Sequence, residues 1–230
     1  MSAVTAPTSP PTASPERTGG PPLVALALGT FAIGTDGFVI AGVLPAIARD
    51  MHLNLGTAGL LVTVFAVVYA VAAPMLTAAS ARFDRRCVLV VGMGVLSAAN
   101  LAAAISTGEA WLIVARVAAA MGAAAYSPIA LAAAVQLAPP EQRGRAVSRV
   151  LAGMTVSLVL GVPLGALVGA LVGWRWTFAV VGTIAAVVAV AIRRSLPTLP
   201  AVATSSLRVR LALLGRPEVA ANLGATFAWI

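Results

Sequence analysis

The sequence is dominated by apolar stretches that are each long enough to cross a lipid bilayer. A helix needs about 20 apolar residues to span a hydrocarbon core of roughly 30 Å. Six segments approach or exceed this length, and short connections join them. They run over Leu23–Ile47, Gly56–Ala79, Val88–Ile105, Trp111–Leu137, Val150–Val172 and Thr177–Ile192, of which the last is the shortest. The pattern predicts an all-α, polytopic membrane protein with six spans.

The segments that flank these spans have a different composition. Residues 1–22 are rich in Pro, Thr and Ser and lack an apolar period, which is typical of a disordered tail. A signal peptide is disfavoured because the strongly basic leader is missing and the apolar run from Leu23 exceeds the usual 7 to 15 or so residues. We therefore expect a disordered cytoplasmic tail over 1–22, a six-span unit over 23–194, a cytoplasmic linker over 195–217 and the start of a truncated seventh span over 218–230.

The composition excludes several classes of protein. Of the 230 residues, 60% are hydrophobic and only 10% are charged, against about 25% charged in an ordinary soluble domain. A soluble enzyme is therefore not expected. The single cysteine, Cys87, excludes an internal disulfide, and the single histidine, His52, argues against a histidine-based metal or catalytic cluster. We expect no cofactor and no metal.

The basic residues report how the spans are oriented. All fifteen are arginines, and the net charge is +8, which in a soluble protein would suggest nucleic-acid binding. Cytoplasmic loops of membrane proteins collect Arg and Lys, and a cytoplasmic amino terminus places twelve arginines inside. These are Arg17, Arg82, Arg85, Arg86, Arg143, Arg145, Arg149, Arg193, Arg194, Arg208, Arg210 and Arg216, and only Arg49 and Arg175 lie outside. Trp111, Trp174 and Trp176 map to the outer interface, where indole rings prefer to lie. The charge is therefore a topology signal, and no nucleic-acid partner is expected.

Six spans also divide into two trios. Because three is odd, the second trio is inverted relative to the first, and inverted repeats are a common plan of secondary transporters. The second and fifth spans each carry a proline among small residues, Pro74 and Pro163. Arginine in place of lysine and the abundance of alanine indicate a GC-rich bacterial genome, which places the protein in the plasma membrane.

Two charges lie inside the spans, at one depth. Asp36 is about thirteen residues into the first span, roughly 20 Å from the cytoplasmic edge, and Arg116 in the antiparallel fourth span is roughly 22 Å from that edge. A charge in hydrocarbon costs at least about 2.5 kcal/mol, so both should face the bundle interior or a water-filled cavity. One interpretation is a structural ion pair or separately solvated charges. The other is a proton-responsive acid beside a fixed positive charge.

A glycine strip and a charged loop are two further candidate elements. Gly161, Gly165, Gly169 and Gly173 are four residues apart in the fifth span, with Pro163 among them. Residues at this spacing share a helix face, so the strip permits close approach of another helix, in generic packing or in gating. The loop after the second span contains Arg82, Asp84, Arg85 and Arg86, which either retain positive charge inside or take part in gating.

Polar residues within the spans provide no catalytic constellation. Thr35, Tyr69, Asn100, Tyr126 and Ser127 lack the neighbouring His and carboxylate of a nucleophilic site. They are predicted to be hydrogen-bonded packing groups or cavity-lining groups, and the last four are the cavity-lining candidates. The Gly92-Met93-Gly94 sequence lacks the third glycine of a dinucleotide-binding loop and continues as a span. The protein is not expected to be an enzyme.

Several motifs together carry a family resemblance. They are residues 35–45 around Asp36, the 59–63 and 73–74 segments of the second span, Arg116 with Gly122, residues 161–165 and residues 173–178. From about Leu23 to Arg194 the chain resembles the amino-terminal half of a major facilitator superfamily transporter. The similarity is to the twelve-span drug:proton antiporters, and especially to the arabinose-efflux-permease-like branch. The resemblance implies a six-helix bundle built as a 3+3 inverted repeat, followed by the start of a seventh helix. It also implies a role of Arg116 in proton transfer.

The loop between the second and third spans departs from the pattern of that superfamily. Thr77 and Asp84 stand where the motif has glycines and Ala81 where it has Asp, while Arg82, Arg85 and Arg86 remain. The charge-relay latch attributed to the motif is therefore not expected here. The family also has a second six-span half, so the chain reads as a fragment.

The resemblance implies proton-coupled export of a small lipophilic compound, with the substrate site at mid-membrane between two halves. Asp36 would be the coupling acid, Arg116 its partner, and the glycine strip a sliding contact between the halves. Partners would be the bilayer, the substrate, protons, and the missing second half in the same full-length chain or a partner. Export of a sugar or another metabolite is an alternative within the superfamily. A non-transporting half-length membrane protein or interaction subunit is an alternative of another class, whereas a channel is disfavoured because no filter-like segment is present.

Overall fold

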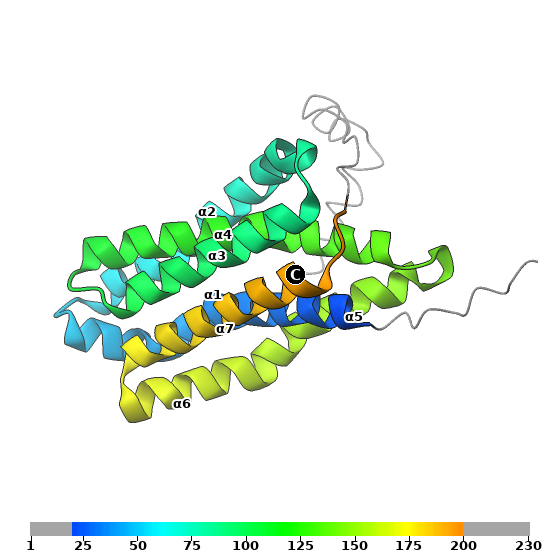
Figure 1. Cartoon of the computed structure of the whole chain (residues 1–230). Helices are drawn as coiled ribbons and strands as arrows, with labels where there is room; N and C mark the ends of the chain where they lie inside the picture. The colour runs from blue at the N-terminus through cyan, green and yellow to red at the C-terminus, as the bar shows by residue number, and fades with distance from the viewer. Residues whose placement is uncertain (1–19, 200–230) are drawn as a thin grey trace, which may run out of the picture.

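The computed structural model describes residues 20–199, which form a bundle of six long helical spans without strands in this range (Figure 1). Each span is long and apolar enough to cross a membrane. The helices are α1 (Pro21–Asp50), α2 (Leu55–Ala79), α3 (Arg85–Ala104), α4 (Glu109–Leu137), α5 (Arg143–Val156) followed in the same span by α6 (Val162–Val172), and α7 (Trp174–Ser195). The all-α, six-span architecture expected from the sequence is confirmed.

The helices begin and end at slightly different residues from those expected. α1 begins at Pro21, and the sixth span starts at Trp174 and ends at Ser195, so it is not short. Trp174 is the first residue of this helix, and its buried ring packs edge-on against Phe178, with ring centroids 5.8 Å apart. The expected bounds of the tail (1–22) and of the linker (195–217) are wrong where the structure describes them, because residues 21 and 22 belong to α1 and Ser195 to α7. Residues 1–19 of the tail, the linker beyond residue 199 and the expected seventh span lie outside the described residues.

Tight connections separate the helices. Asn54 caps α2 by accepting a hydrogen bond from the backbone N–H of Thr57 at 2.7 Å, and Asp84 caps α3 by accepting one from the N–H of Arg86 at 2.9 Å. Between α6 and α7 the chain turns at Gly173, which has a φ of +102°. Glycine adopts this conformation without the steric cost that a Cβ would add.

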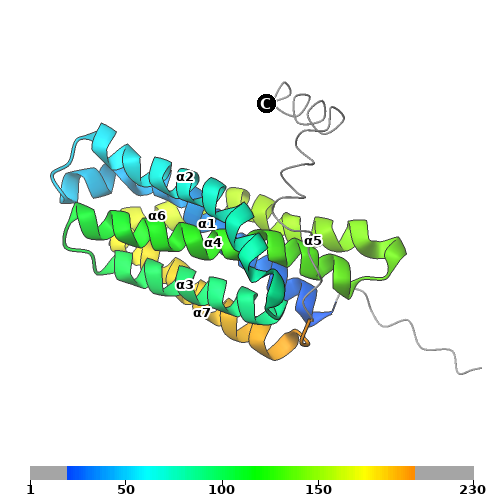
Figure 2. The same cartoon turned by 90° about the horizontal axis from the view of Figure 1, so that it is seen from above.

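The packing of the spans is symmetric under exchange of the two trios. α4 lies between α2 and α3, as Figure 2 shows, and in the same way α1 packs against both α5 and α7. α3 and α7, the last members of the two trios, pack against each other. α1 and α4 are therefore the central helices, and residues that face inward from them meet in the middle of the bundle.

The span formed by α5 and α6 is interrupted by a π-helical turn over Ser157–Gly161. Pro163, in the first turn of α6, has no N–H to donate to a carbonyl of the preceding turn. This loss loosens the helical hydrogen-bond ladder, and π-helical turns of this kind often occur at functional sites. The interruption lies where the span crosses α1, which contacts α5, the π-helical turn and α6.

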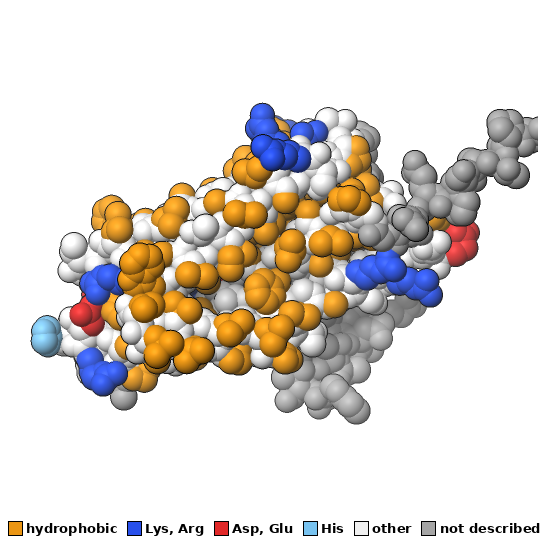
Figure 3. All heavy atoms as spheres, turned by 60° about the horizontal axis from the view of Figure 1, so that its bottom comes forward, with side chains coloured by type: hydrophobic (Ala, Val, Ile, Leu, Met, Phe, Trp, Pro, Cys, Tyr) orange, Lys and Arg blue, Asp and Glu red, His pale blue; other side chains and the backbone are white. Residues whose placement is uncertain are grey.

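Charged side chains lie mainly at the margins of the bundle, and hydrophobic side chains cover the broad face between them (Figure 3). The end at which α1 starts and α7 finishes also holds the α2–α3 and α4–α5 connections. It carries Arg82, Arg85, Arg86, Arg143, Arg145, Arg149, Arg193 and Arg194, and we call it the arginine-rich end. The opposite end has Arg49 and Arg175. This distribution of charge and the six apolar spans are those of a multi-pass membrane protein.

Candidate functional site

The two charges inside the spans form an ion pair at the centre of the bundle. Arg116 on α4 donates from Nη1 to Oδ1 of Asp36 on α1 at 2.9 Å, and its Nη2 lies 3.4 Å from the backbone carbonyl oxygen of Asp36. Both side chains are almost completely buried, with 1% and 0% exposed. The equal depths estimated from helix rise therefore correspond to a direct contact.

Small residues allow the helices around Arg116 to approach closely. Gly122 on α4 faces Gly92 and Leu96 on α3, and a Cβ at Gly122 would lie 2.6 Å from the Gly92 carbonyl oxygen. No such Cβ fits without a shift of backbone, so glycine is required at this crossing. Gly92, which superficially resembled part of a nucleotide-binding loop, is a helix-packing residue.

Two aromatic rings enclose the guanidinium of Arg116. Its Cζ lies 4.4 Å from the ring centroid of Phe65 on α2 and 5.9 Å from that of Phe178 on α7. Phe65 is stacked in turn on Tyr69, with centroids 6.3 Å apart and an interplanar angle of 12°. A desolvated cation over an aromatic face gains about 2 kcal/mol, so the rings offset part of the cost of burying the charge.

An apolar cavity of about 300 Å³ lies directly behind Phe65. Residues of α1, α2 and α5 form its wall, including Ile33, Phe38, Phe65, Tyr69 and Met154. The hydroxyl of Tyr69 is the only polar side-chain group in that lining. Because Phe65 both lines the cavity and covers Arg116, one aromatic ring separates the cavity from the ion pair.

The ion pair leaves part of its hydrogen-bonding capacity unused. Among the described residues, Oδ2 of Asp36 and Nε of Arg116 have no hydrogen-bond partner, and neither has the neighbouring Thr35 Oγ1. A carboxylate that uses one oxygen for the guanidinium can take a proton on the other. Oδ2 of Asp36 is therefore a carboxylate oxygen at the centre of the bundle that no described residue contacts by a hydrogen bond.

The structure separates the four cavity-lining candidates into two groups. Tyr69 lines the cavity behind Phe65, and Tyr69 and Ser127 line a second cavity of about 410 Å³ between α2 and α4. Asn100 and Tyr126 are fully buried and are absent from the lining of these two cavities, so a role as cavity walls stays a prediction for them. Tyr126 donates to the Leu26 carbonyl at 2.9 Å and Asn100 to the Leu96 carbonyl at 3.0 Å. The acceptor of Tyr126 is on the neighbouring helix α1, whereas that of Asn100 is one turn back in α3 itself, and among the described residues Oδ1 of Asn100 has no partner.

The glycine strip of the fifth span packs inside this bundle. A Cβ at Gly165 would lie 2.5 Å from Val39, one at Gly169 2.6 Å from Val43, and one at Gly161 would collide with Thr35. The strip therefore faces α1, and these three glycines do not present an open surface to a second half. Gly173 differs, since nothing lies within 4 Å of its Cβ position and its role is the turn into α7.

The charged loop after α2 binds the end of α7. The carboxylate of Asp84 accepts from the N–H of Leu199 at 3.1 Å, the N–H of Arg85 donates to the Leu199 carbonyl at 3.2 Å, and Arg86 donates to the carbonyl of Arg193. These contacts join the first trio to the second. Arg82 lies over the ring of Phe83, 5.3 Å from its centroid, on the exposed side of the loop.

An additional cluster joins the helices at the opposite end. The carboxylate of Asp50 at the end of α1 accepts from the guanidinium of Arg175 and from the indole N–H of Trp174, the latter at 3.2 Å. Arg175 also donates to the carbonyl of Ser106 beyond α3 at 3.1 Å. Sequence reasoning missed this cluster and the rings of Phe65 and Phe178. An Asp and an Arg close to the same side of the membrane could have indicated the cluster at this end.

Comparisons with known proteins agree with this architecture. Residues 26–229 match the family model of the Major Facilitator Superfamily. The chain is 35% identical over 205 residues to an uncharacterized MFS-type transporter of Bacillus subtilis. The match covers 89% of this chain and 53% of that protein. It is 37% identical over 202 residues to a chloramphenicol resistance protein of Streptomyces lividans, over 86% of this chain and 52% of that protein. The chain thus spans about half the length of these curated relatives.

Solved structures show the same fold. A bacterial homolog of the human lysosomal transporter Spinster, in an inward-facing and unoccupied conformation, superposes with a TM-score of 0.73 at 22% identity. The match covers 92% of this chain and 50% of that one. The inward-open xylose transporter of E. coli gives a TM-score of 0.65 at 18% identity, over 76% and 48% of the two chains.

Proposed function

Because the chain belongs to the major facilitator superfamily, we propose that the protein is a secondary transporter that exports a small lipophilic compound in exchange for protons. The observation that carries the proposal is the buried Asp36–Arg116 pair, which lies one aromatic ring away from an apolar cavity. The cavity would bind the compound and the pair would bind the proton.

Proton binding at Asp36 changes the charge of the bundle interior. With Asp36 ionised, its charge cancels that of Arg116, and with Asp36 protonated, the guanidinium remains as an uncompensated cation. Arginine keeps its charge at any physiological pH, so only the carboxyl group can switch. Such a change of one charge in a low-dielectric interior biases the equilibrium between two conformations, because each conformation solvates the cation to a different extent.

The lining of the cavity supports a lipophilic compound over a sugar. Sugar binding needs several hydrogen-bonding side chains, and the tyrosine hydroxyl is the single polar side-chain group in this lining. The similarity to a chloramphenicol resistance protein, a drug-resistance relative, agrees with a small uncharged cargo. The opposite wall of the site would come from a second six-span half, in the same full-length chain or in a partner, as in other secondary transporters.

The charge distribution supports an orientation with the arginine-rich end in the cytoplasm of the cell and the protein in the plasma membrane. The start of α1 and the end of α7 are both at that end, where Leu199 bonds to Asp84 and Arg85. A protease or a membrane-impermeant label applied to intact cells should therefore not reach a tag at the amino terminus. Labelling of the tag in intact cells would contradict the orientation.

The proposal is tested with the full-length transporter in everted membrane vesicles. An imposed pH gradient should drive accumulation of chloramphenicol or a similar neutral drug in the vesicles. Asp36→Asn should abolish that accumulation while leaving the amount of protein in the membrane unchanged. Glu141→Gln is the control, because it also removes one carboxylate charge but from an exposed position in the connection between α4 and α5. Accumulation with the normal pH response in Asp36→Asn would refute the proposal.

A further inference from the structure

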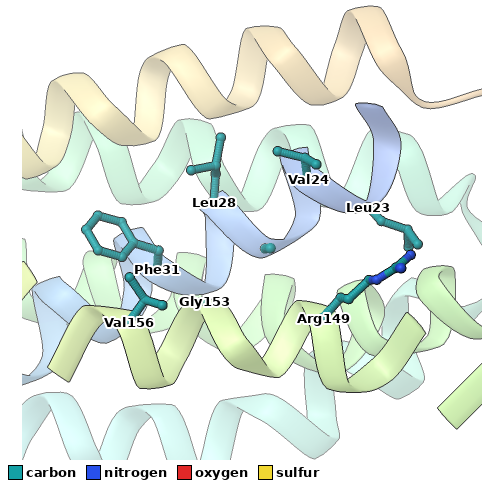
Figure 4. Close-up of a pocket in the computed structure, with 8 residues that line it drawn as sticks. Leu23, Val24, Leu28, Phe31, Arg149, Gly153 and Val156 are labelled. Carbon is teal, nitrogen blue, oxygen red and sulfur yellow. The ribbon is translucent and has the colours of Figure 1, made fainter. Parts of the chain in front are cut away.

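A further apolar cavity, outside the candidate substrate site, lies between α1 and α5. It has a volume of about 350 Å³ and is shown in Figure 4. Leu23, Val24, Leu28 and Phe31 line it from α1, and Val156 lines it from α5. Its floor is Gly153, whose backbone packs directly on the Ala27 carbonyl, so the two helices touch beneath an open channel. We call this cavity the α1–α5 groove.

The groove opens on the side of α1 that faces away from α2. Phe31, at its inner end, also lines a pocket of about 140 Å³ together with Thr177, Val181 and Ile184 of α7. The cavity beside the ion pair, in contrast, opens between α1 and α2. The groove and the candidate substrate cavity are therefore on different sides of α1, separated by α5.

The exposed side chains of the groove are suited to hydrocarbon. Val24 is 55% exposed, Leu28 45% and Val156 43%, and all three lie in helices of membrane-spanning length. In a membrane these side chains would contact acyl chains, and a channel between two helices holds one chain in a defined position. The length of the groove, from Leu23 to Phe31, corresponds to roughly 12 Å along α1.

A positive charge is present where the groove reaches the arginine-rich end. Arg149 on α5 lines the groove, is exposed, and extends toward Leu23 at the start of α1 (Figure 4). Arg193 and Arg194 are in the last turn of α7, which runs along the other side of α1 at the same end. A guanidinium carries five N–H donors, so Arg149 can bind a phosphate in addition to the contact that it already makes.

We propose that the α1–α5 groove is a binding site for an anionic phospholipid of the cytoplasmic leaflet, with one acyl chain in the groove and the phosphate on Arg149. The apolar channel that ends in a cation matches the amphipathic structure of such a lipid. Basic pockets between spans at the cytoplasmic surface bind anionic headgroups by the same electrostatics. The bound chain would fill the space between α1 and α5 above Gly153. The inference does not depend on which compound is transported.

Native mass spectrometry of the purified full-length transporter in micelles with equal amounts of phosphatidylglycerol and phosphatidylcholine of identical chains tests the proposal. We expect preferential retention of phosphatidylglycerol. Arg149→Gln should lower its ratio to phosphatidylcholine roughly fivefold. Arg82→Gln, which removes the same charge from an exposed position at the same end, should leave the ratio unchanged. Val24→Trp, at an exposed position, should fill the groove and reduce retention of the lipid.

Each alternative has its own outcome. Equal losses in Arg149→Gln and Arg82→Gln would overturn the proposal in favour of diffuse electrostatic attraction. Equal retention of both lipids in the wild type would mean unspecific annular lipid. Displacement of phosphatidylglycerol by excess inorganic phosphate would reduce the site to a simple anion site. Unchanged retention of phosphatidylglycerol in Val24→Trp would show that no acyl chain lies in the groove, which would overturn the proposal. Far-ultraviolet circular dichroism of each variant confirms that the fold is intact.

Discussion

The energetics of the Asp36–Arg116 pair can be measured by a double-mutant cycle. Loss of one partner from a buried ion pair typically costs about 3–5 kcal/mol, because the remaining charge is left without compensation. Asp36→Asn should lower the free energy of unfolding by an amount in this range, because the Arg116 side chain is 1% exposed and cannot lose its proton. Arg116→Gln should cost less, since an isolated Asp36 can bind a proton and so become neutral.

The double variant Asp36→Asn/Arg116→Gln buries no charge. Two amide side chains can still form a hydrogen bond across the 2.9 Å contact, which contributes about 1 kcal/mol. The double variant should therefore be more stable than Asp36→Asn alone, with a coupling energy of about 2–3 kcal/mol between the two sites. Equilibrium unfolding of the purified protein in mixed micelles, followed by circular dichroism, provides the free energies.

The same variants separate a structural role of the pair from a role in proton coupling. If the two single losses simply add in the double variant, the side chains do not form a buried pair and the reasoning is refuted. If the pair is only structural, the stable double variant should regain transport driven by a pH gradient. We expect it to remain folded and uncoupled, because no proton-binding group is left at the centre.

Three further variants test particular contacts. Gly122→Ala should lower the free energy of unfolding by about 1–3 kcal/mol, since its Cβ would meet the backbone of α3. Gly94→Ala is the control: nothing lies within 4 Å of the added Cβ, so the free energy of unfolding should stay the same or rise in the same assay. Gly173→Ala should cost about 1–2 kcal/mol because of the positive φ; a smaller loss would show that the turn can relax. Phe65→Ala should open the cavity to Arg116 and permit proton uptake without substrate, measured with a pH-sensitive dye in vesicles; tight vesicles would contradict a separating role of the ring.

The sequence was sufficient for the spans and for the central charges. Apolar length alone identified the six spans, because the bilayer imposes that length on a helix. The shared depth of Asp36 and Arg116 followed from helix rise, and their position inside the bundle followed from the cost of a charge in hydrocarbon, whereas an ion pair and separately solvated charges both remained open. Both arguments depend on the membrane as a solvent and need no information about how the helices pack.

The sequence was not sufficient for contacts that depend on helix rotation. In a soluble helix an apolar stripe shows which face is buried, but α2 and α6 are apolar on all sides, so no stripe identifies Phe65 as the residue over Arg116. For the same reason Asn100 and Tyr126 could not be distinguished from Tyr69 and Ser127. The glycine strip was recognised, but its partner helix was not.

The hydrogen bonds at both ends of the bundle also determine how this unit can move. At one end the loop after α2 holds the backbone at Leu199, and at the other Arg175 bridges the ends of α1 and α3. Rotation of one trio against the other would break both sets of bonds at once. We therefore expect the six spans to move as one rigid body. Any opening and closing would then take place at the outer surface of this six-span unit and not between its two trios.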